Sequence, residues 1–124
     1  MYEIEVTAQF NAAHRLRGYR GKCENLHGHN WKVSVSVKSQ RLDKTGMVLD
    51  FKELKQKINS IIDKLDHSYL NNLEFFRKNN PTSENIARYI YDSIIRKIKK
   101  SVYKISKVTV WETDTCGASF SPDV

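Results

Sequence analysis

The N-terminal segment alternates apolar and polar residues from Tyr2 to about His14, a pattern that is typical of a long β-strand with one buried face. The apolar positions of one parity are Tyr2, Ile4, Val6, Ala8, Phe10 and Ala12. A second alternating run consists of Trp31, Val33, Val35 and Val37. The sequence therefore predicts two long strands joined by a glycine-marked loop. If the second strand extends back into that loop, His27 and His29 point to the same covered side as Trp31.

Apolar residues at spacings of three and four predict two helices after these strands. In the first helix they are Phe51, Leu54, Ile58, Ile61, Ile62 and Leu65. In the second helix they are Ile86, Ile90, Ile94 and Ile98. Asp50, with Glu53 three residues later, and Thr82, just after Pro81, are suitable N-cap residues for the two helices. An Asn-rich connection joins them.

A third strand is predicted from Ile105 to about Glu112, followed by a short strand over 118–120. The order strand, strand, helix, helix, strand, strand predicts an α+β fold, with a four-stranded antiparallel sheet covered by two helices on one face. We expect residues 1–124 to form a single domain. An open sheet of this size has two edges, so pairing with another copy of the chain is expected.

Composition narrows the possible environments. The N-terminus has no basic region followed by an apolar run, and no apolar stretch approaches the roughly 20 residues that a membrane helix needs. Its two cysteines, Cys23 and Cys116, do not make a disulfide framework, which favours a reducing cytoplasm. We therefore expect a soluble cytoplasmic protein without a membrane partner.

The formal net charge of +7 favours an anionic partner, which can be nucleic acid, an acidic membrane surface or a phosphorylated small molecule. Charge alone does not choose among them, and many of the cations fit simple solvated helix faces. Aromatic residues are not interleaved with basic ones along any exposed-looking strand, so a stacking platform for nucleic acid is not evident. A nucleic-acid-binding module is therefore the less favoured function.

The segment Cys-Glu-Asn-Leu-His-Gly-His, from Cys23 to His29, is the strongest chemical signal in the chain. With His14 at the end of the first strand, three imidazoles can converge on one zinc ion and leave its fourth position open, as in a catalytic site. A zinc hydrolase is compatible with the same three histidines. Each histidine alone can equally be an ordinary strand-end or loop residue.

Cys23 has two functional interpretations. The thiolate can complete a tetrahedral site, or it can act as an acid/base group beside the metal. Arg20 and Lys22 favour the second interpretation, because a basic substrate pocket would need them. The adjacent pair Asp66 and His67 favours it further, since a carboxylate commonly fixes the tautomer of an imidazole that transfers protons.

These residues belong to a wider set of motifs by which the chain resembles the 6-pyruvoyl-tetrahydropterin and 6-carboxy-tetrahydropterin synthase family over nearly its whole length. The motifs are Phe10-Asn-Ala-Ala-His14, Cys23-x-x-x-His27-Gly-His29-Asn30, Gly46-Met-Val-Leu-Asp50-Phe51, Leu65-Asp66-His67, Pro81-Thr-Ser-Glu-Asn85 and Val110-Trp-Glu112-Thr113. Each motif is weak alone, but their common order makes the resemblance specific.

The resemblance implies a role for each matching residue. His14, His27 and His29 match the zinc ligands, and Cys23, Asp66 and His67 match the catalytic residues. Glu112 matches the carboxylate that anchors the pterin ring, while Thr82 and Ser83 match positions lining the pterin pocket. The implied fold is the tunnelling fold, assembled as a hexamer of two stacked trimers with sites at subunit interfaces.

The resemblance also implies a reaction on 7,8-dihydroneopterin triphosphate. The three residues between Cys23 and His27 resemble the bacterial 6-carboxy-tetrahydropterin synthases of the queuosine pathway, which release triphosphate and acetaldehyde. The animal 6-pyruvoyl-tetrahydropterin synthases have a longer spacing there and stop at elimination of triphosphate. The expected activity is thus that of a carbon–carbon lyase, with the pyruvoyl reaction as the alternative.

Overall fold

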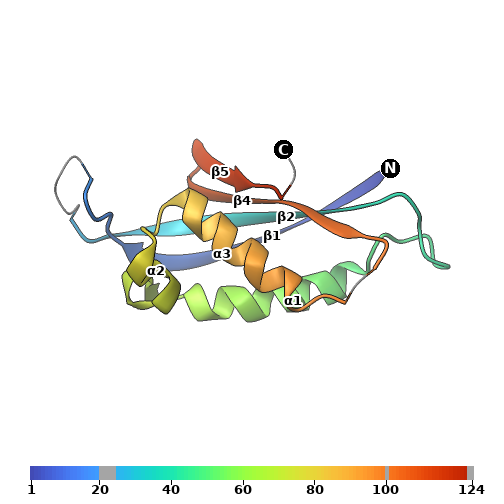
Figure 1. Ribbon diagram of the computed structural model, residues 1–124, viewed down its shortest axis with the longest axis horizontal. Coiled ribbons are helices and arrows are strands. Elements are labelled where there is room, and N and C mark those ends of the chain that lie inside the picture. Colours follow the sequence, from blue (N-terminus) through green and yellow to red (C-terminus); the bar gives the residue numbers. More distant parts are fainter. Residues whose placement is uncertain (20–24, 100, 123–124) are drawn as a thin grey trace.

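Two long antiparallel strands form the centre of the sheet in the computed structural model, which describes residues 1–19, 25–99 and 101–122 (Figure 1). Strand β1 (Tyr2–His14) pairs with β2 (His27–Ser39) along its whole length, so that Tyr2 faces Ser39 and His14 faces His27. The alternation predicted both strands, and β2 does extend back to His27. Both loop histidines therefore belong to a strand.

The sheet has five strands in the order β3-β1-β2-β4-β5. Strand β4 (Lys104–Thr113) pairs antiparallel with β2, and β5 (Cys116–Phe120) pairs antiparallel with β4. The expectation of four strands, all antiparallel, was wrong. A fifth strand, β3 (Ser68–Tyr69), runs parallel to β1 opposite Ala12 and Ala13. A strand of two residues has no alternation that a sequence pattern can reveal.

The two predicted helices cover one face of the sheet (Figure 1). Helix α1 (Phe51–Leu65) begins where the Asp50 side chain accepts a hydrogen bond from the Lys52 N–H at 2.8 Å. Helix α3 (Ser83–Ile95) is capped by Thr82 and ends before the predicted Ile98, which still packs against the core. The connection between them also folds, into a 3-10 turn η1 (Leu70–Asn72) and a short helix α2 (Glu74–Lys78).

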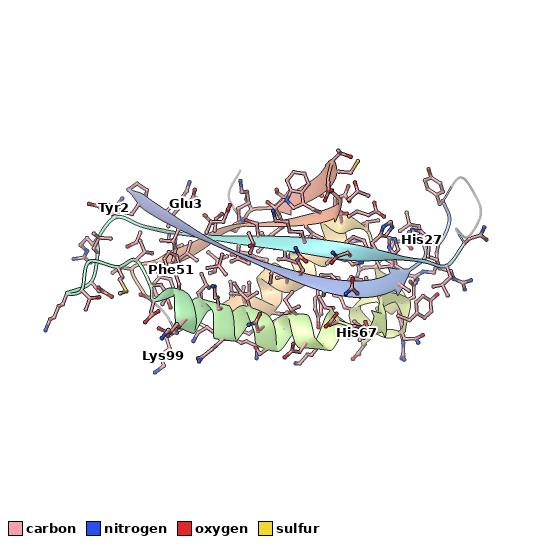
Figure 2. All side chains as sticks on the ribbon, turned by 180° about the vertical axis from the view of Figure 1, so that it is seen from behind. Tyr2, Glu3, His27, Phe51, His67 and Lys99 are labelled. Carbon is pink, nitrogen blue, oxygen red and sulfur yellow. The ribbon has the colours of Figure 1, made fainter. Side chains whose placement is uncertain are left out.

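The core lies between the helices and the covered face of the sheet, where Phe10, Trp31, Val33 and Val110 are at most 1% exposed. His14 is also 1% exposed and lies at one end of this core, with its ring against the edge of Trp31 at a centroid distance of 4.9 Å. In Figure 2 the labelled His27 and His67 lie toward the same end of the molecule. In the part of the chain that is described, no helix is long and apolar enough to cross a membrane.

Candidate metal centre and active site

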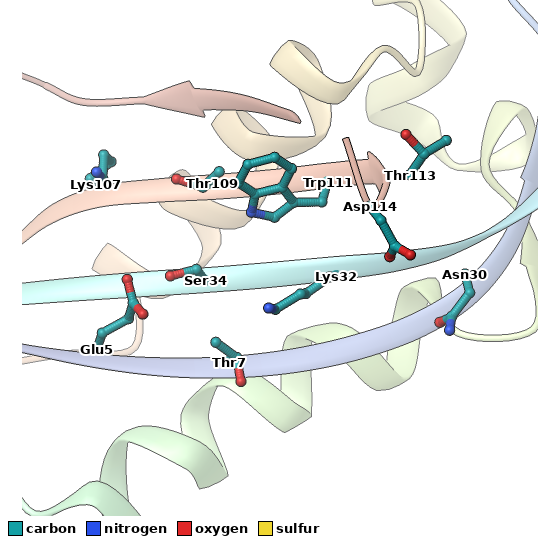
Figure 3. A pocket seen from close by; sticks show the side chains of 10 residues that line it. All are labelled: Glu5, Thr7, Asn30, Lys32, Ser34, Lys107, Thr109, Trp111, Thr113 and Asp114. Carbon is teal, nitrogen blue, oxygen red and sulfur yellow. The ribbon is translucent and has the colours of Figure 1, made fainter. Parts of the chain in front are cut away.

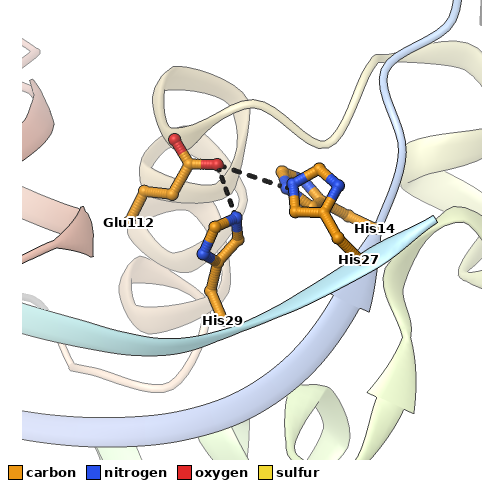
Figure 4. Close-up of side chains that lie close together, drawn as sticks. All are labelled: His14, His27, His29 and Glu112. Carbon is orange, nitrogen blue, oxygen red and sulfur yellow. Dashed lines mark hydrogen bonds and ion pairs between the residues drawn. The ribbon is translucent and has the colours of Figure 1, made fainter. Parts of the chain in front are cut away.

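Three strands bring four potential metal ligands together at the end of the core (Figure 4). They are His14 from β1, His27 and His29 from β2, and Glu112 from β4, and their ligand atoms all lie within 4.8 Å of one another. The strand register explains the convergence, because His14 faces His27 directly and His29 lies two residues along the same side of β2. The three histidines predicted from the sequence therefore meet in the fold.

The ring nitrogens are oriented as a metal site requires. His14 Nδ1 lies 2.8 Å from the Pro81 carbonyl oxygen, and His27 Nδ1 lies 2.8 Å from the Asn25 carbonyl oxygen. A carbonyl oxygen only accepts hydrogen bonds, so both Nδ1 atoms carry a proton and both Nε2 atoms are the ones available to bind a metal ion. These two Nε2 atoms lie 3.0 Å apart. If both rings are neutral, their Nε2 lone pairs repel each other unless a proton or a metal ion lies between them.

The spacing of the donor atoms fits one divalent ion. Glu112 Oε1 lies 2.9 Å from His29 Nε2 and 3.3 Å from His14 Nε2. Ligand atoms about 2.0–2.1 Å from a tetrahedral zinc ion are separated by roughly 3.3 Å, close to these distances. Imidazole nitrogens and a carboxylate oxygen also suit zinc and neighbouring transition metals. The cluster can therefore hold a metal ion with little rearrangement.

Glu112 occupies a place that the sequence interpretation did not foresee. Its carboxylate faces the three histidines, whereas the resemblance implied only a contact with the pterin ring. The signal was present in the chain, because Val108 and Val110 share the parity of Glu112 and lie in the core. The Glu112 side chain is 34% exposed, so it remains accessible from outside the cluster.

The Asp66 and His67 pair forms directly after α1. Asp66 Oδ1 accepts a hydrogen bond from the backbone N–H of Asn11 at 2.9 Å, and Asp66 Oδ2 lies 3.4 Å from His67 Nε2. The backbone N–H of His67 donates to the Asn11 carbonyl oxygen at 2.6 Å. These contacts hold the pair against β1 near the strand's C-terminal end, three residues before His14.

His67 adopts a backbone conformation that is unusual for a residue other than glycine, with φ of 55°. This left-handed conformation costs about 1–2 kcal/mol for an L-residue with a Cβ atom. Its side chain is 78% exposed, so burial does not compensate for that cost. Strain of this kind concentrates at functional sites, which is consistent with a catalytic role for His67.

His29 and His67 line the same shallow hollow, of about 420 Å³. Asn11, Ala12 and Gly28 are among the other residues that line it. The Asp66 and His67 pair and the histidine cluster therefore lie at the same end of the sheet.

A second hollow, of about 370 Å³, lies on the sheet face opposite the helices (Figure 3). Its lining mixes cations, Lys32 and Lys107, with the carboxylates Glu5 and Asp114, around the ring of Trp111. The Trp111 ring covers Gly117 so closely that a Cβ atom at Gly117 would lie 2.6 Å from it. This hollow contains none of the residues that the sequence motifs single out as catalytic or metal-binding.

The remaining predicted site residues divide into two groups. Cys23, with Arg20 and Lys22, lies outside the residues that the structure describes. Thr82 and Ser83 are half-buried at the start of α3, next to the Pro81 carbonyl that holds His14. Cys116, for which the sequence suggested no role, is exposed at the start of β5.

Comparisons with known proteins show which family the chain is similar to. The sequence profile of the family described as 6-pyruvoyl tetrahydropterin synthase matches residues 3–123. The 6-carboxy-5,6,7,8-tetrahydropterin synthase of Synechocystis is 39% identical, over 98% of this chain and 95% of that protein. The protein of the same name from Haemophilus influenzae is 34% identical, over 93% and 95%. The solved structure of Caenorhabditis elegans 6-pyruvoyl tetrahydropterin synthase superposes with a TM-score of 0.87 at 31% identity, covering 98% of this chain and 96% of that one.

Proposed function

Because the chain belongs to the 6-pyruvoyl tetrahydropterin synthase family of lyase-type enzymes, we propose that it is a zinc-dependent 6-carboxy-5,6,7,8-tetrahydropterin synthase. In this reaction 7,8-dihydroneopterin triphosphate and one water give 6-carboxy-5,6,7,8-tetrahydropterin, acetaldehyde and triphosphate. The observation that carries the proposal is the convergence of three imidazoles, two of them with Nδ1 bound to carbonyl oxygens, and the hollow that His29 shares with His67. Relatives that bear this name support the choice of product.

The metal site proposed here consists of His14, His27 and His29. Bound zinc would supply a Lewis acid that makes the substrate's side-chain hydroxyls more acidic and stabilises the negative charge that develops. The protein's own contribution is orientation, since the contacts of His14 with Pro81 and of His27 with Asn25 direct both Nε2 atoms to one point.

We assign proton transfer to Cys23 and to the Asp66 and His67 pair. Hydrogens on the substrate side chain must leave carbon, and the dihydropterin ring must gain hydrogen to reach the tetrahydro level. Asp66 Oδ2 approaches His67 Nε2, which leaves His67 Nδ1 as the atom that exchanges a proton with substrate. The 3.4 Å separation is longer than a hydrogen bond, as is common in catalytic pairs without substrate.

Glu112, Thr82 and Ser83 are proposed to bind the pterin ring. A carboxylate can accept two parallel hydrogen bonds from the amidine edge of a pterin, a geometry that fixes the ring and with it the side chain. The partial exposure of Glu112 is compatible with this contact. Its present approach to His14 and His29 means that ring binding and the histidine cluster compete for the same carboxylate oxygen, Oε1.

The alternative is 6-pyruvoyl-tetrahydropterin synthase activity. The high TM-score between this chain and the Caenorhabditis elegans enzyme of that name supports it. The two sets of products differ by the elements of one water, which adds a hydroxyl to C1′ and a hydrogen to C2′ as the bond between them breaks. Acetaldehyde is therefore diagnostic. Incubation of zinc-loaded protein with 7,8-dihydroneopterin triphosphate should release acetaldehyde and triphosphate in equal amounts, and triphosphate without acetaldehyde would establish the alternative.

We further propose a cytoplasmic homohexamer of single-domain chains that works in queuosine biosynthesis without a nucleic-acid or membrane partner. The sheet topology supports self-association, because β3 covers only Ala12 and Ala13 of the outer edge of β1. A long strand with a largely uncovered edge is commonly paired with another copy. Light scattering of the purified protein would test the hexamer, and a monomer in solution would contradict it.

A further inference from the structure

The ring of His14 is held by a residue 67 positions away in the sequence. Its Nδ1 donates to the Pro81 carbonyl oxygen at 2.8 Å in a contact that is buried from solvent. The direction of this carbonyl therefore determines which ring nitrogen carries the proton and where the Nε2 lone pair points. Whatever fixes the Pro81 carbonyl also fixes one ligand of the proposed metal centre.

Asn80 fixes it from the N-terminal side. Its Oδ1 accepts from the Arg17 N–H at 2.9 Å, and its Nδ2 donates to the Arg17 carbonyl oxygen at 2.7 Å. Its own carbonyl oxygen accepts from the Thr82 N–H at 2.8 Å and from Asn85 Nδ2 at 2.9 Å. Pro81 thus lies inside a turn closed by the contact between Thr82 and Asn80. The first residue of this turn, Asn80, is hydrogen-bonded to the backbone of Arg17, three residues after His14.

Thr82 fixes the same carbonyl from the C-terminal side. Its Oγ1 accepts from the Asn85 N–H at 3.1 Å, which ties the turn to the first turn of α3. The proline ring restricts φ of Pro81 to about −65°. The bond from the Thr82 N–H to the Asn80 carbonyl spans Pro81 and restricts its ψ as well. The orientation of the Pro81 carbonyl is therefore determined by the contacts of its two neighbours.

We propose that Asn80 is a positioning residue of the metal centre, which orients the His14 imidazole through the Pro81 carbonyl and so increases the affinity for zinc. The inference rests on the proposed zinc site, but it is independent of the substrate and the products. Loss of the Asn80 side chain would release the turn from Arg17 and let the Pro81 carbonyl rotate. The His14 ring would then no longer be held in the orientation for metal binding.

Asn71 offers a matched control. It binds the backbone of Arg15 through the same pair of contacts, with its Oδ1 accepting at 3.0 Å and its Nδ2 donating at 2.8 Å, and it belongs to η1 and not to the turn around Pro81. The dissociation constant for zinc would be measured for wild type, Asn80→Ala and Asn71→Ala by competition with a chelator of known affinity. The apo-protein melting temperatures would be compared in parallel.

The expected result is zinc binding weakened by about 10- to 100-fold in Asn80→Ala and by less than about threefold in Asn71→Ala, with similar losses of melting temperature. Asn80→Asp, which keeps the acceptor for the Arg17 N–H but loses the donor, should weaken binding to an intermediate degree and replaces the alanine variant if that one does not fold. Equal effects of the two alanine variants, or unchanged affinity in the Asn80 variants, would overturn the inference alone. A wild-type protein that binds no zinc would overturn the proposed metal centre with it.

Discussion

The Nε2 atoms of His14 and His27 lie 3.0 Å apart, although the Nδ1 atoms of both rings already donate to carbonyl oxygens. When both imidazoles are neutral, their Nε2 lone pairs point at each other, and His14 is 1% exposed, so water has little access to separate them. A bound cation converts this repulsion into attraction. The cluster is thus a site whose own geometry favours metal binding.

Zinc should therefore stabilise the folded protein strongly. At a free zinc concentration 100-fold above the dissociation constant, binding adds about 2.7 kcal/mol, which corresponds to an increase of roughly 10 °C in the melting temperature of a domain of this size. Differential scanning calorimetry with and without zinc measures the shift. Magnesium, which prefers oxygen ligands, serves as the control and should have almost no effect. Equal shifts with both ions would argue against a histidine site.

Substitutions of His67 should separate its backbone conformation from its chemistry. Asparagine tolerates the left-handed φ, so His67→Asn is expected to keep wild-type stability. Valine does not tolerate it because its side chain is branched, so His67→Val should lower the free energy of unfolding by about 1–2 kcal/mol. Both variants should lower kcat by about 10²–10⁴-fold, as they remove the proton-transferring ring. Urea unfolding and steady-state kinetics give the two readouts. A His67→Asn variant with wild-type kcat would show that only the backbone matters.

Glu112→Gln distinguishes a ring-binding carboxylate from a metal ligand. Removal of the charged acceptor should reduce kcat/KM by about 10- to 100-fold, mostly through KM, because a charge-assisted hydrogen bond contributes about 1.5–3 kcal/mol. Zinc content should stay at the wild-type level if His14, His27 and His29 suffice as ligands. Metal analysis together with kinetics checks both statements. If the variant loses its zinc, Glu112 is a fourth ligand and the proposed role in ring binding fails.

Gly117→Ala should destabilise the protein without affecting zinc binding. A Cβ atom there would lie 2.6 Å from Cε3 of Trp111, so the indole ring must shift, at a cost of about 1–3 kcal/mol. Gly28→Ala is the matched control for stability, since its Cβ atom would lie 3.8 Å from the nearest backbone oxygen, that of Ala12. Thermal unfolding of both variants tests the contrast. Similar stabilities would mean that the Trp111 ring moves aside at no cost.

The long elements of the fold were predictable because their periodicity is repeated many times. The alternation from Tyr2 to His14 predicted β1 at its observed bounds, and the spacing of apolar residues from Phe51 to Leu65 predicted α1. Strand β3 and helix α2 were missed, because two and five residues are too few to show a period. Tertiary contacts place them, such as the bond from the His67 N–H to the Asn11 carbonyl.

The sequence predicted which site residues lie together where those residues are on the same strand or are neighbours in the chain. The parity of His27 and His29 with Trp31 predicted their covered side, and the Asp66 and His67 pair is a direct neighbour pair. The approach of Glu112 to the histidines needed the register of β4 against β2, which sequence alone does not provide. The contact of His14 with Pro81 joins the end of β1 to the turn before α3, 67 residues away, and no local pattern contains it.

We propose that the protein converts 7,8-dihydroneopterin triphosphate at a zinc centre built from His14, His27 and His29. The most direct test of this proposal is the zinc content and the acetaldehyde yield of wild type and His27→Ala, measured on the same preparations. His27 is only half-buried, so its truncation should leave the fold intact. We expect about one zinc per chain and acetaldehyde equimolar with triphosphate for wild type, and loss of both zinc and acetaldehyde in His27→Ala. Full zinc content in the variant, or acetaldehyde released by zinc-free protein, would contradict it.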